Sequence, residues 1–216
     1  MLSRAFIFGG RSLHRHTPVS SHLHLQQAHT NRFLQMAAPG VNADGSLKKY
    51  ATPEPTTVNT KAAVAGDIEA IKKVPTDALN AQDDAGNTML IWASDKGQAE
   101  AVKLLLEKGA DANVKGFIGN TALSRAARSG HTDIVRALLD APSMASANTP
   151  NDKMQYPLHF AAFKRHRNTV QAMLEYPSVD TTVLDRKGRT PAEDTSDEVI
   201  RDMILAERKK RATASM

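Results

Sequence analysis

Histidine is the residue type in this sequence whose chemistry most readily supports catalysis or metal binding: the 216 residues contain eight histidines and no cysteine. Two closely spaced histidine pairs near the start could bring two imidazole nitrogens to one metal ion, since neutral imidazole is a good ligand for zinc. The segment that holds them has no helical pattern to fix its geometry, so we expect no metal site there. The pairs are His14 with His16, and His22 with His24.

Three further histidines, His131, His159 and His166, lie in the second half of the chain. No second histidine or carboxylate stands at ligand spacing from any of them, which argues against a metal site or general acid–base catalysis. The sequence also has no Gly-x-x-x-x-Gly-Lys phosphate loop, no Gly-x-Ser-x-Gly nucleophile turn and no paired-carboxylate pattern. We therefore expect no catalytic residue, no cofactor and no metal, and a chain that is not an enzyme.

The formal net charge of +5 is unevenly distributed along the chain. Residues 1–43 contain four arginines and no acidic residue, and the run 208–211 consists of four cations. Residues 44–207 contain 20 basic against 23 acidic residues, a net charge of −3. The middle of the chain is thus mildly acidic, and it shows no aromatic residues interleaved with a basic groove. Nucleic acid is therefore not the expected partner.

The elements that position all other candidate residues belong to an internal repeat. Aligning Gly97, Gly130 and Arg165 superimposes three similar stretches, with spacings of 33 and then 35 residues. Each stretch has small residues in a first helix, a turn, and then an apolar stripe at helical spacing. Alanines let neighbouring first helices approach closely, and glycine in the turn permits positive φ. Because no unit can bury its stripe alone, we expect the units to stack.

Several motifs in these units resemble the ankyrin repeat. The sequence reads Gly-Asn-Thr-Ala-Leu at 119–123, Gly-His at 130–131, Tyr-Pro-Leu-His at 156–159 and Gly-Ala-Asp-Ala-Asn at 109–113. The resemblance covers residues 58–207, about four and a half repeats of about 33 residues. It implies an all-α ankyrin-repeat solenoid of helix–turn–helix units joined by short β-hairpin loops, with the first and last units as caps. It also implies that the three histidines of the repeats are structural.

One unit departs from the family pattern. Met154 replaces the hairpin glycine and Arg165 replaces the glycine of the interhelix turn. We expect this unit to be the least regular. Thr88, Thr121 and Thr190 stand where a hydroxyl can cap the first helix of a unit.

The chain is divided into a leader of residues 1–43, a linker of residues 44–57, the repeats of residues 58–207 and a basic tail of residues 208–216. The leader resembles a mitochondrial transit peptide, because it alternates apolar residues with arginine and lacks acids. The alternative is a disordered extension with translation from Met36, which would place the protein in the cytoplasm or nucleus. The basic tail could be a targeting signal, but the solvated end of the last helix is the favoured interpretation.

Ankyrin arrays commonly bind partners through the hairpin tips and the concave face of the inner helices, so the resemblance gives a candidate surface. It begins acidic, becomes apolar at Phe117 and Ile118, and ends basic. Exposed apolar residues at a tip are unusual unless a partner covers them, although these two could instead pack on the adjacent hairpin. The predicted partner-binding residues are Asp84, Asp95, Lys96, Lys115, Phe117, Ile118, Arg128, Lys153, Phe163, Lys164, Arg186, Lys187 and Arg189.

These features predict a non-catalytic protein–protein interaction module, an adaptor or scaffold. Its partner is expected to be a protein or peptide with an apolar anchor and acidic flanks. The chain has no apolar run long enough to span a membrane, and we expect it to be monomeric. The alternative is an assembly chaperone or inhibitor that transiently masks the interface of a partner subunit.

Overall fold

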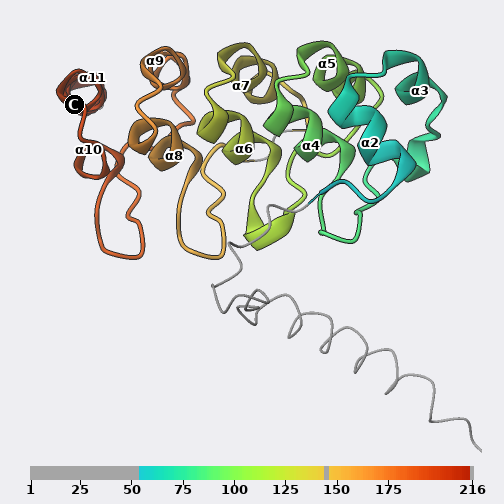
Figure 1. Cartoon of the computed structure of the whole chain (residues 1–216). Coiled ribbons are helices and arrows are strands. Elements are labelled where there is room, and N and C mark those ends of the chain that lie inside the picture. The colour runs from blue at the N-terminus through green and yellow to red at the C-terminus, as the bar shows by residue number, and fades with distance from the viewer. Residues whose placement is uncertain (1–53, 144–145, 215–216) are drawn as a thin grey trace, which may run out of the picture. The chain divides into compact units, whose positions relative to one another are not determined.

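The computed structural model describes residues 54–143 and 146–214. Within these residues, helix pairs follow one another along the chain, each with an inner and an outer helix (Figure 1). The inner helices are α2 (Val58–Ala65), α4 (Met89–Lys96), α6 (Ala122–Ser129), α8 (Pro157–Phe163) and α10 (Pro191–Asp194). The outer helices are α3 (Ile68–Lys73), α5 (Ala99–Glu107), α7 (Thr132–Leu139), α9 (Arg167–Leu174) and α11 (Glu198–Ala214). Short 3-10 turns lie at Thr76–Ala78 and Phe117–Gly119.

Each row of helices packs along its own layer, so that α4 contacts α6 and α6 contacts α8, while α5 contacts α7 and α7 contacts α9. Small residues make the close contacts of the inner row possible, as Ala93, Ala126 and Ala161 are fully buried. Leucine side chains fill the space toward the outer row, where Leu105 and Leu138 are also fully buried. The predicted all-α stack of helix pairs is confirmed.

Three of the inner helices begin at the predicted threonines: α4 after Thr88, α6 after Thr121 and α10 after Thr190, whose N–H and hydroxyl both donate to the Glu193 carboxylate. The Thr88 hydroxyl accepts a hydrogen bond from the Ile91 N–H and the Thr121 hydroxyl accepts one from the Ser124 N–H, each at 3.3 Å. A side-chain cap of this kind satisfies one of the free N–H groups in the first turn of a helix. Tyr156, at the equivalent position before α8, provides no such bond.

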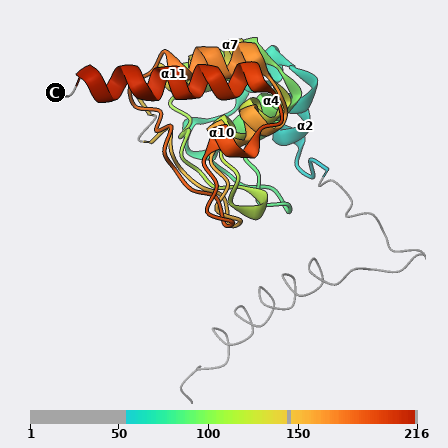
Figure 2. The same cartoon turned by 90° about the vertical axis from the view of Figure 1, so that its left-hand side faces the viewer.

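Hairpin loops connect each outer helix to the next inner helix and gather along one edge, away from α11 (Figure 2). Each tip spans five residues and is closed by one backbone hydrogen bond of 2.9 Å between its first and last residues. These connections contain no strand within the described residues. The four tips are residues 83–87, 116–120, 151–155 and 185–189, named here the first to fourth tips.

The unit around α8 keeps the backbone turns of its neighbours instead of deforming. Met154 and Arg165 take positive φ values of 58° and 62°, close to the 79° of Gly130. The expectation of irregular geometry in this unit is therefore wrong for its turns. The substitutions appear as local backbone strain, since residues with a Cβ are disfavoured at positive φ.

The last unit is altered at both of its helices. α10 has four residues whereas α8 has seven, and α11 has 17 residues. The predicted boundary at residues 207 and 208 falls inside α11. The Arg211 guanidinium donates to the carbonyl oxygens of Leu174 and Tyr176, at 2.8 and 3.2 Å, so it ties α11 to the end of α9. The leader and most of the linker lie outside the described residues.

Candidate partner-binding site

A groove of about 360 Å³ lies between the third and fourth tips and extends to the end of α8 and α10. It brings together five of the residues predicted from the sequence to bind a partner, which come from three different elements. We call it the tip groove. Its lining consists of Lys153, Gln155, Phe163, Asp185, Arg186, Lys187, Arg189 and Asp194.

Phe163 supplies the apolar part of the tip groove. It is the last residue of α8, and 58% of its surface is exposed. Because α10 ends at Asp194 after four residues, the next inner helix provides only a short neighbour for this ring. The ammonium nitrogen of Lys164 lies 5.8 Å from the ring centroid, within the range of a cation–π contact. An exposed aromatic ring beside cations is a typical centre of binding energy in a protein interface.

Arg189 forms part of the groove wall and is already engaged by acidic groups. Its guanidinium lies 2.8 Å from a carboxylate oxygen of Asp185 and 2.6 Å from one of Asp194. Burial raises the pKa of Asp185, but hydrogen bonds from the Arg189 N–H, its side chain and the Lys187 N–H outweigh it and lower the pKa to about 2. Burial also raises the pKa of Asp194, although Arg189 opposes this shift. Arg189 therefore shapes the groove more than it offers a free charge.

Four other cations around the groove are exposed and lack such partners. Within the described residues, none of Lys153, Lys164, Arg186 and Lys187 has a carboxylate oxygen within 4.0 Å. Several arginines elsewhere in the repeats are paired, as Arg136 is with Glu175 and Arg167 is with Asp197. The rim of the tip groove thus carries positive charge that no carboxylate among the described residues pairs with.

The predicted residues of the first tip and of α4 lie farther along the inner row. Asp84 is exposed at the first tip, and its N–H donates to the Thr56 hydroxyl at 3.0 Å. Asp95 is mostly buried and pairs with Arg125 at 3.6 Å and with Lys96 at 3.5 Å. The acidic start of the surface is therefore partly neutralised within the chain.

The apolar residues of the second tip are held between its neighbours. The Phe117 N–H donates to the Asn87 side-chain oxygen at 2.9 Å, and the Ile118 carbonyl accepts from the Asp152 N–H at 3.2 Å. Both side chains are half-buried. Gly116 begins this tip, where the first, third and fourth tips begin with an Asp or Asn whose side chain accepts two backbone N–H bonds.

The remaining predicted residues lie beside these tips. Lys115 is exposed, and its carbonyl accepts from the Gln82 amide at 2.8 Å. Arg128 is exposed on α6, and its carbonyl is 3.0 Å from the His166 ring nitrogen Nε2. Neither side chain reaches the lining of the tip groove.

The three histidines of the repeats make contacts between units. His159 is buried with Nε2 at 2.9 Å from the Arg189 carbonyl, and Nε2 of His131 lies 3.3 Å from the Asp95 carbonyl. In the described part of the chain, no three His, Cys, Asp or Glu residues are grouped so as to hold a metal ion. The two histidine pairs of the leader lie outside that part.

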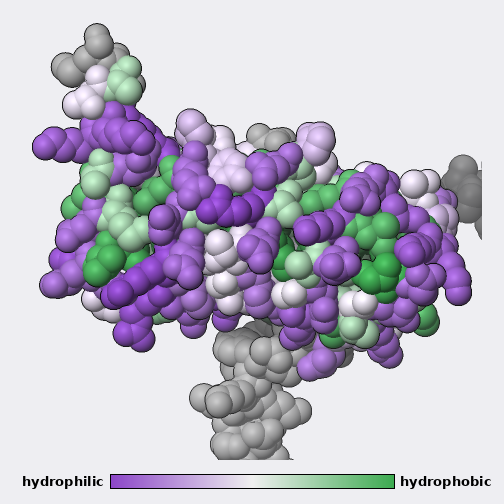
Figure 3. All heavy atoms as spheres, turned by 90° about the horizontal axis from the view of Figure 1, so that it is seen from above, coloured by the Kyte–Doolittle hydropathy of each residue, from purple (hydrophilic) through white to green (hydrophobic). Residues whose placement is uncertain are grey.

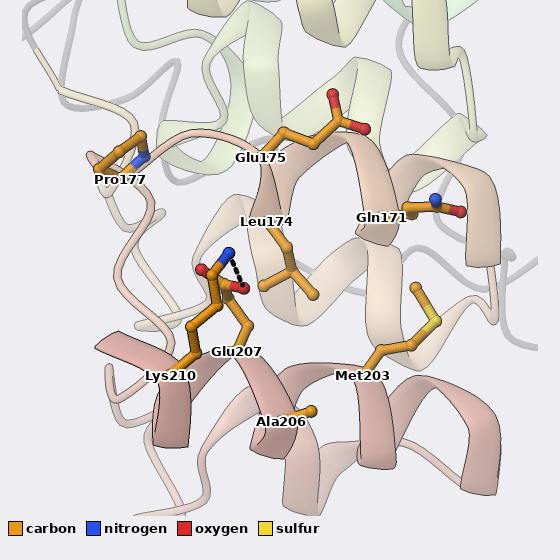
Figure 4. A pocket seen from close by; sticks show the side chains of 8 residues that line it. All are labelled: Gln171, Leu174, Glu175, Pro177, Met203, Ala206, Glu207 and Lys210. Carbon is orange, nitrogen blue, oxygen red and sulfur yellow. Dashed lines mark hydrogen bonds and ion pairs between the residues drawn. The ribbon is translucent and has the colours of Figure 1, made fainter. Parts of the chain in front are cut away.

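A second hollow, of about 630 Å³, lies between α9 and α11 on the outer row (Figure 4). Leu174 and Met203 point into it from the two helices. The charged residues on its walls are bonded within the chain: Glu175 pairs with Arg136, and Glu207 pairs with Arg211 at 3.0 Å. The surrounding outer face is mostly hydrophilic, with short apolar patches (Figure 3). None of the predicted residues lines this hollow.

The comparison with protein families agrees with the architecture. The family description "Ankyrin repeats (3 copies)" matches residues 28–150 and, with overlap, residues 123–194. The chain therefore belongs to the ankyrin-repeat family. No helix among residues 54–143 and 146–214 is long and apolar enough to cross a membrane.

Relatives share only part of their length with this chain. The E3 ubiquitin-protein ligase XBAT33 of Arabidopsis thaliana is 36% identical over 117 residues, which are 52% of this chain and 22% of that protein. The probable E3 ubiquitin-protein ligase XBOS33 of rice (Oryza sativa subsp. japonica) is 51% identical over 53 residues, 24% of this chain and 10% of the ligase. The human transient receptor potential cation channel subfamily A member 1 is 36% identical over 83 residues, 37% of this chain and 7% of the channel.

Proposed function

We propose that this chain is a non-catalytic adaptor that holds an extended segment of a partner protein in the tip groove. The partner segment carries an apolar anchor that packs on Phe163 and acidic residues on either side of it. One observation carries the proposal: Phe163 is exposed amid Lys153, Lys164, Arg186 and Lys187, cations without a carboxylate partner in the described residues.

Several physical arguments support this chemistry. Burying an aromatic ring and an apolar side chain against each other removes apolar surface from water, which supplies most of the energy of small interfaces. Unpaired cations at the rim attract acidic groups and orient them. The ligase and channel names belong to the relatives, whose matching regions are small fractions of their lengths. We propose that partner binding, and not ligase or channel activity, is what this chain has in common with them.

A defined peptide tests this proposal. The acidic peptide is a fluorescein-labelled segment of about ten residues with a Leu-Phe centre and aspartates on both sides, long enough at about 3.3 Å per residue to follow α8. The basic peptide has lysines in place of the aspartates. We expect the full chain to bind the acidic peptide with an affinity that falls as salt is raised, and to bind the basic peptide at least about tenfold more weakly.

Matched variants locate the binding. Phe163→Ser should weaken binding of the acidic peptide at least about tenfold, whereas Leu205→Ser, at a residue of α11 with 45% exposure, should leave it unchanged. The double variant R186E/K187E should abolish binding, and R208E/K209E, which makes the same charge change on α11, should have little effect. The proposal would be refuted if Phe163→Ser and Leu205→Ser weakened binding equally, or if R186E/K187E and R208E/K209E did so. It would also be refuted if the unaltered chain did not bind the acidic peptide.

A further inference from the structure

Two strained residues belong to the same repeat as Phe163. The fourth position of each tip has positive φ, and glycine fills it in the first, second and fourth tips. In the third tip the residue is Met154, with φ of 58°. The turns between inner and outer helices show the same contrast: Gly97 and Gly130 have φ of 77° and 79°, while Arg165 has 62° after α8.

The side chains of these two residues are not anchored in the core of the described fold. Met154 is 45% exposed, so its side chain is not part of the core. Arg165 is exposed, and its guanidinium makes neither a hydrogen bond nor an ion pair with the described residues. A residue with a Cβ at positive φ is less stable than glycine there, and such residues cluster where the side chain has a role in binding or catalysis.

Both residues lie at the edges of the proposed site. Met154 follows Lys153 on the third tip, and Arg165 follows Phe163 by two positions, at opposite ends of α8. The seven residues of α8 span about 10 Å at a rise of about 1.5 Å per residue. An extended segment of only a few residues covers that distance, at about 3.3 Å per residue.

We infer that Met154 and Arg165 are partner-contacting residues that determine specificity at the two ends of the segment bound along α8. This inference rests on the proposed function. The Met154 thioether is flexible and polarisable, so it suits an apolar side chain of the partner. The Arg165 guanidinium suits a carboxylate, which it can bind through two parallel hydrogen bonds. The occupant is thus an extended acidic segment whose apolar residues face Phe163 and Met154.

Glycine substitutions give this inference an unusual signature, because stability and binding should change in opposite directions. Met154→Gly and Arg165→Gly relieve the strain, and we expect each to raise the Tm of the full chain by about 1–3 °C. Each should also weaken binding of the acidic peptide by about threefold to tenfold. The alanine variants keep the positive φ and remove the side chain, so they should weaken binding equally without raising Tm.

The outcomes separate this inference from the proposed function. Glycine variants that bind the acidic peptide as tightly as the unaltered chain, while Phe163→Ser still loses binding, overturn the inference alone. A lower Tm in the glycine variants also overturns it, because the side chains would then stabilise the fold. Weaker binding in the glycine variants but not in the alanine variants assigns the effect to backbone flexibility and refutes the inference. If the unaltered chain does not bind the acidic peptide, both the inference and the proposed function are refuted.

Discussion

Replacing Gly97 by alanine is expected to destabilise the protein through a clash that can be traced to single atoms. Gly97 has φ of 77°, and a Cβ there would lie 2.7 Å from Cε1 of His131 and 3.0 Å from its two ring nitrogens. The left-handed backbone costs about 1–2 kcal/mol for alanine. Alanine also lowers the conformational entropy of the unfolded chain, which stabilises the folded protein by about 0.4–1 kcal/mol. Displacing the ring also breaks the 3.3 Å contact of Nε2 with the Asp95 carbonyl, worth about 1 kcal/mol.

The expected net loss is about 2 kcal/mol, which corresponds to a fall in Tm of about 4–8 °C for a chain of this size. Urea unfolding of the full chain, monitored by far-ultraviolet circular dichroism, measures this loss. We expect a lower midpoint urea concentration and an unchanged dependence of the unfolding free energy on urea. Gly109→Ala is the matched control, because Gly109 has φ of 90° but nothing within 4 Å of the added Cβ. It should cost about 1 kcal/mol or less, from backbone strain alone.

The difference between the two alanine variants measures the packing of His131 on Gly97. Equal losses of stability in Gly97→Ala and Gly109→Ala would show that the His131 ring does not lie against Gly97. A Gly97→Ala protein as stable as the unaltered chain would show that the turn does not have positive φ.

Three further substitutions test the fold and the groove. Tyr156→Thr should raise the free energy of unfolding by about 1 kcal/mol in thermal melts, because it restores a hydroxyl cap where α8 has none. Trp92→Phe should lower it by about 1–3 kcal/mol in urea titrations, because the buried carboxylate of Asp83 loses an indole N–H donor at 2.7 Å. Asp185 has a pKa of about 2, below its ordinary 3.8, so its contribution to stability is complete above about pH 4 and is lost as the pH falls through 2. Asp185→Asn should therefore flatten the fall in Tm between about pH 4 and pH 2. An unchanged fall in Tm over this range would count against the Arg189 ion pair.

Much of the helical stack could be predicted because its determinants are local and recur. Alanine fits between adjacent inner helices, and leucine at helical spacing requires a partner layer, so residues such as Ala126 and Leu138 define where each helix packs. The caps at Thr88 and Thr121 depend on residues only three positions away. The end of α11 was less predictable, because the bonds that tie Arg211 to the carbonyls of Leu174 and Tyr176 join residues 37 and 35 positions apart.

The candidate site depends on relations that the repeat pattern does not contain. The pattern placed Phe163 on the surface, but it does not show that the neighbouring α10 ends after four residues. It also assigned Arg189 to the partner, whereas the structure places two carboxylates on its guanidinium. Met154 stood out in the sequence as a replaced glycine, yet only its positive φ and exposure suggest a role in binding.

Two-dimensional amide NMR of the full chain, titrated with the acidic peptide, tests the central proposal most directly. We expect the amide shifts that change most to belong to the third and fourth tips and to α8, around Lys153, Phe163 and Lys187. Those of α11, including Leu205, should change little. Shift changes centred on the hollow between α9 and α11, or no shift changes when the peptide is saturating, would show that the tip groove is not the binding site.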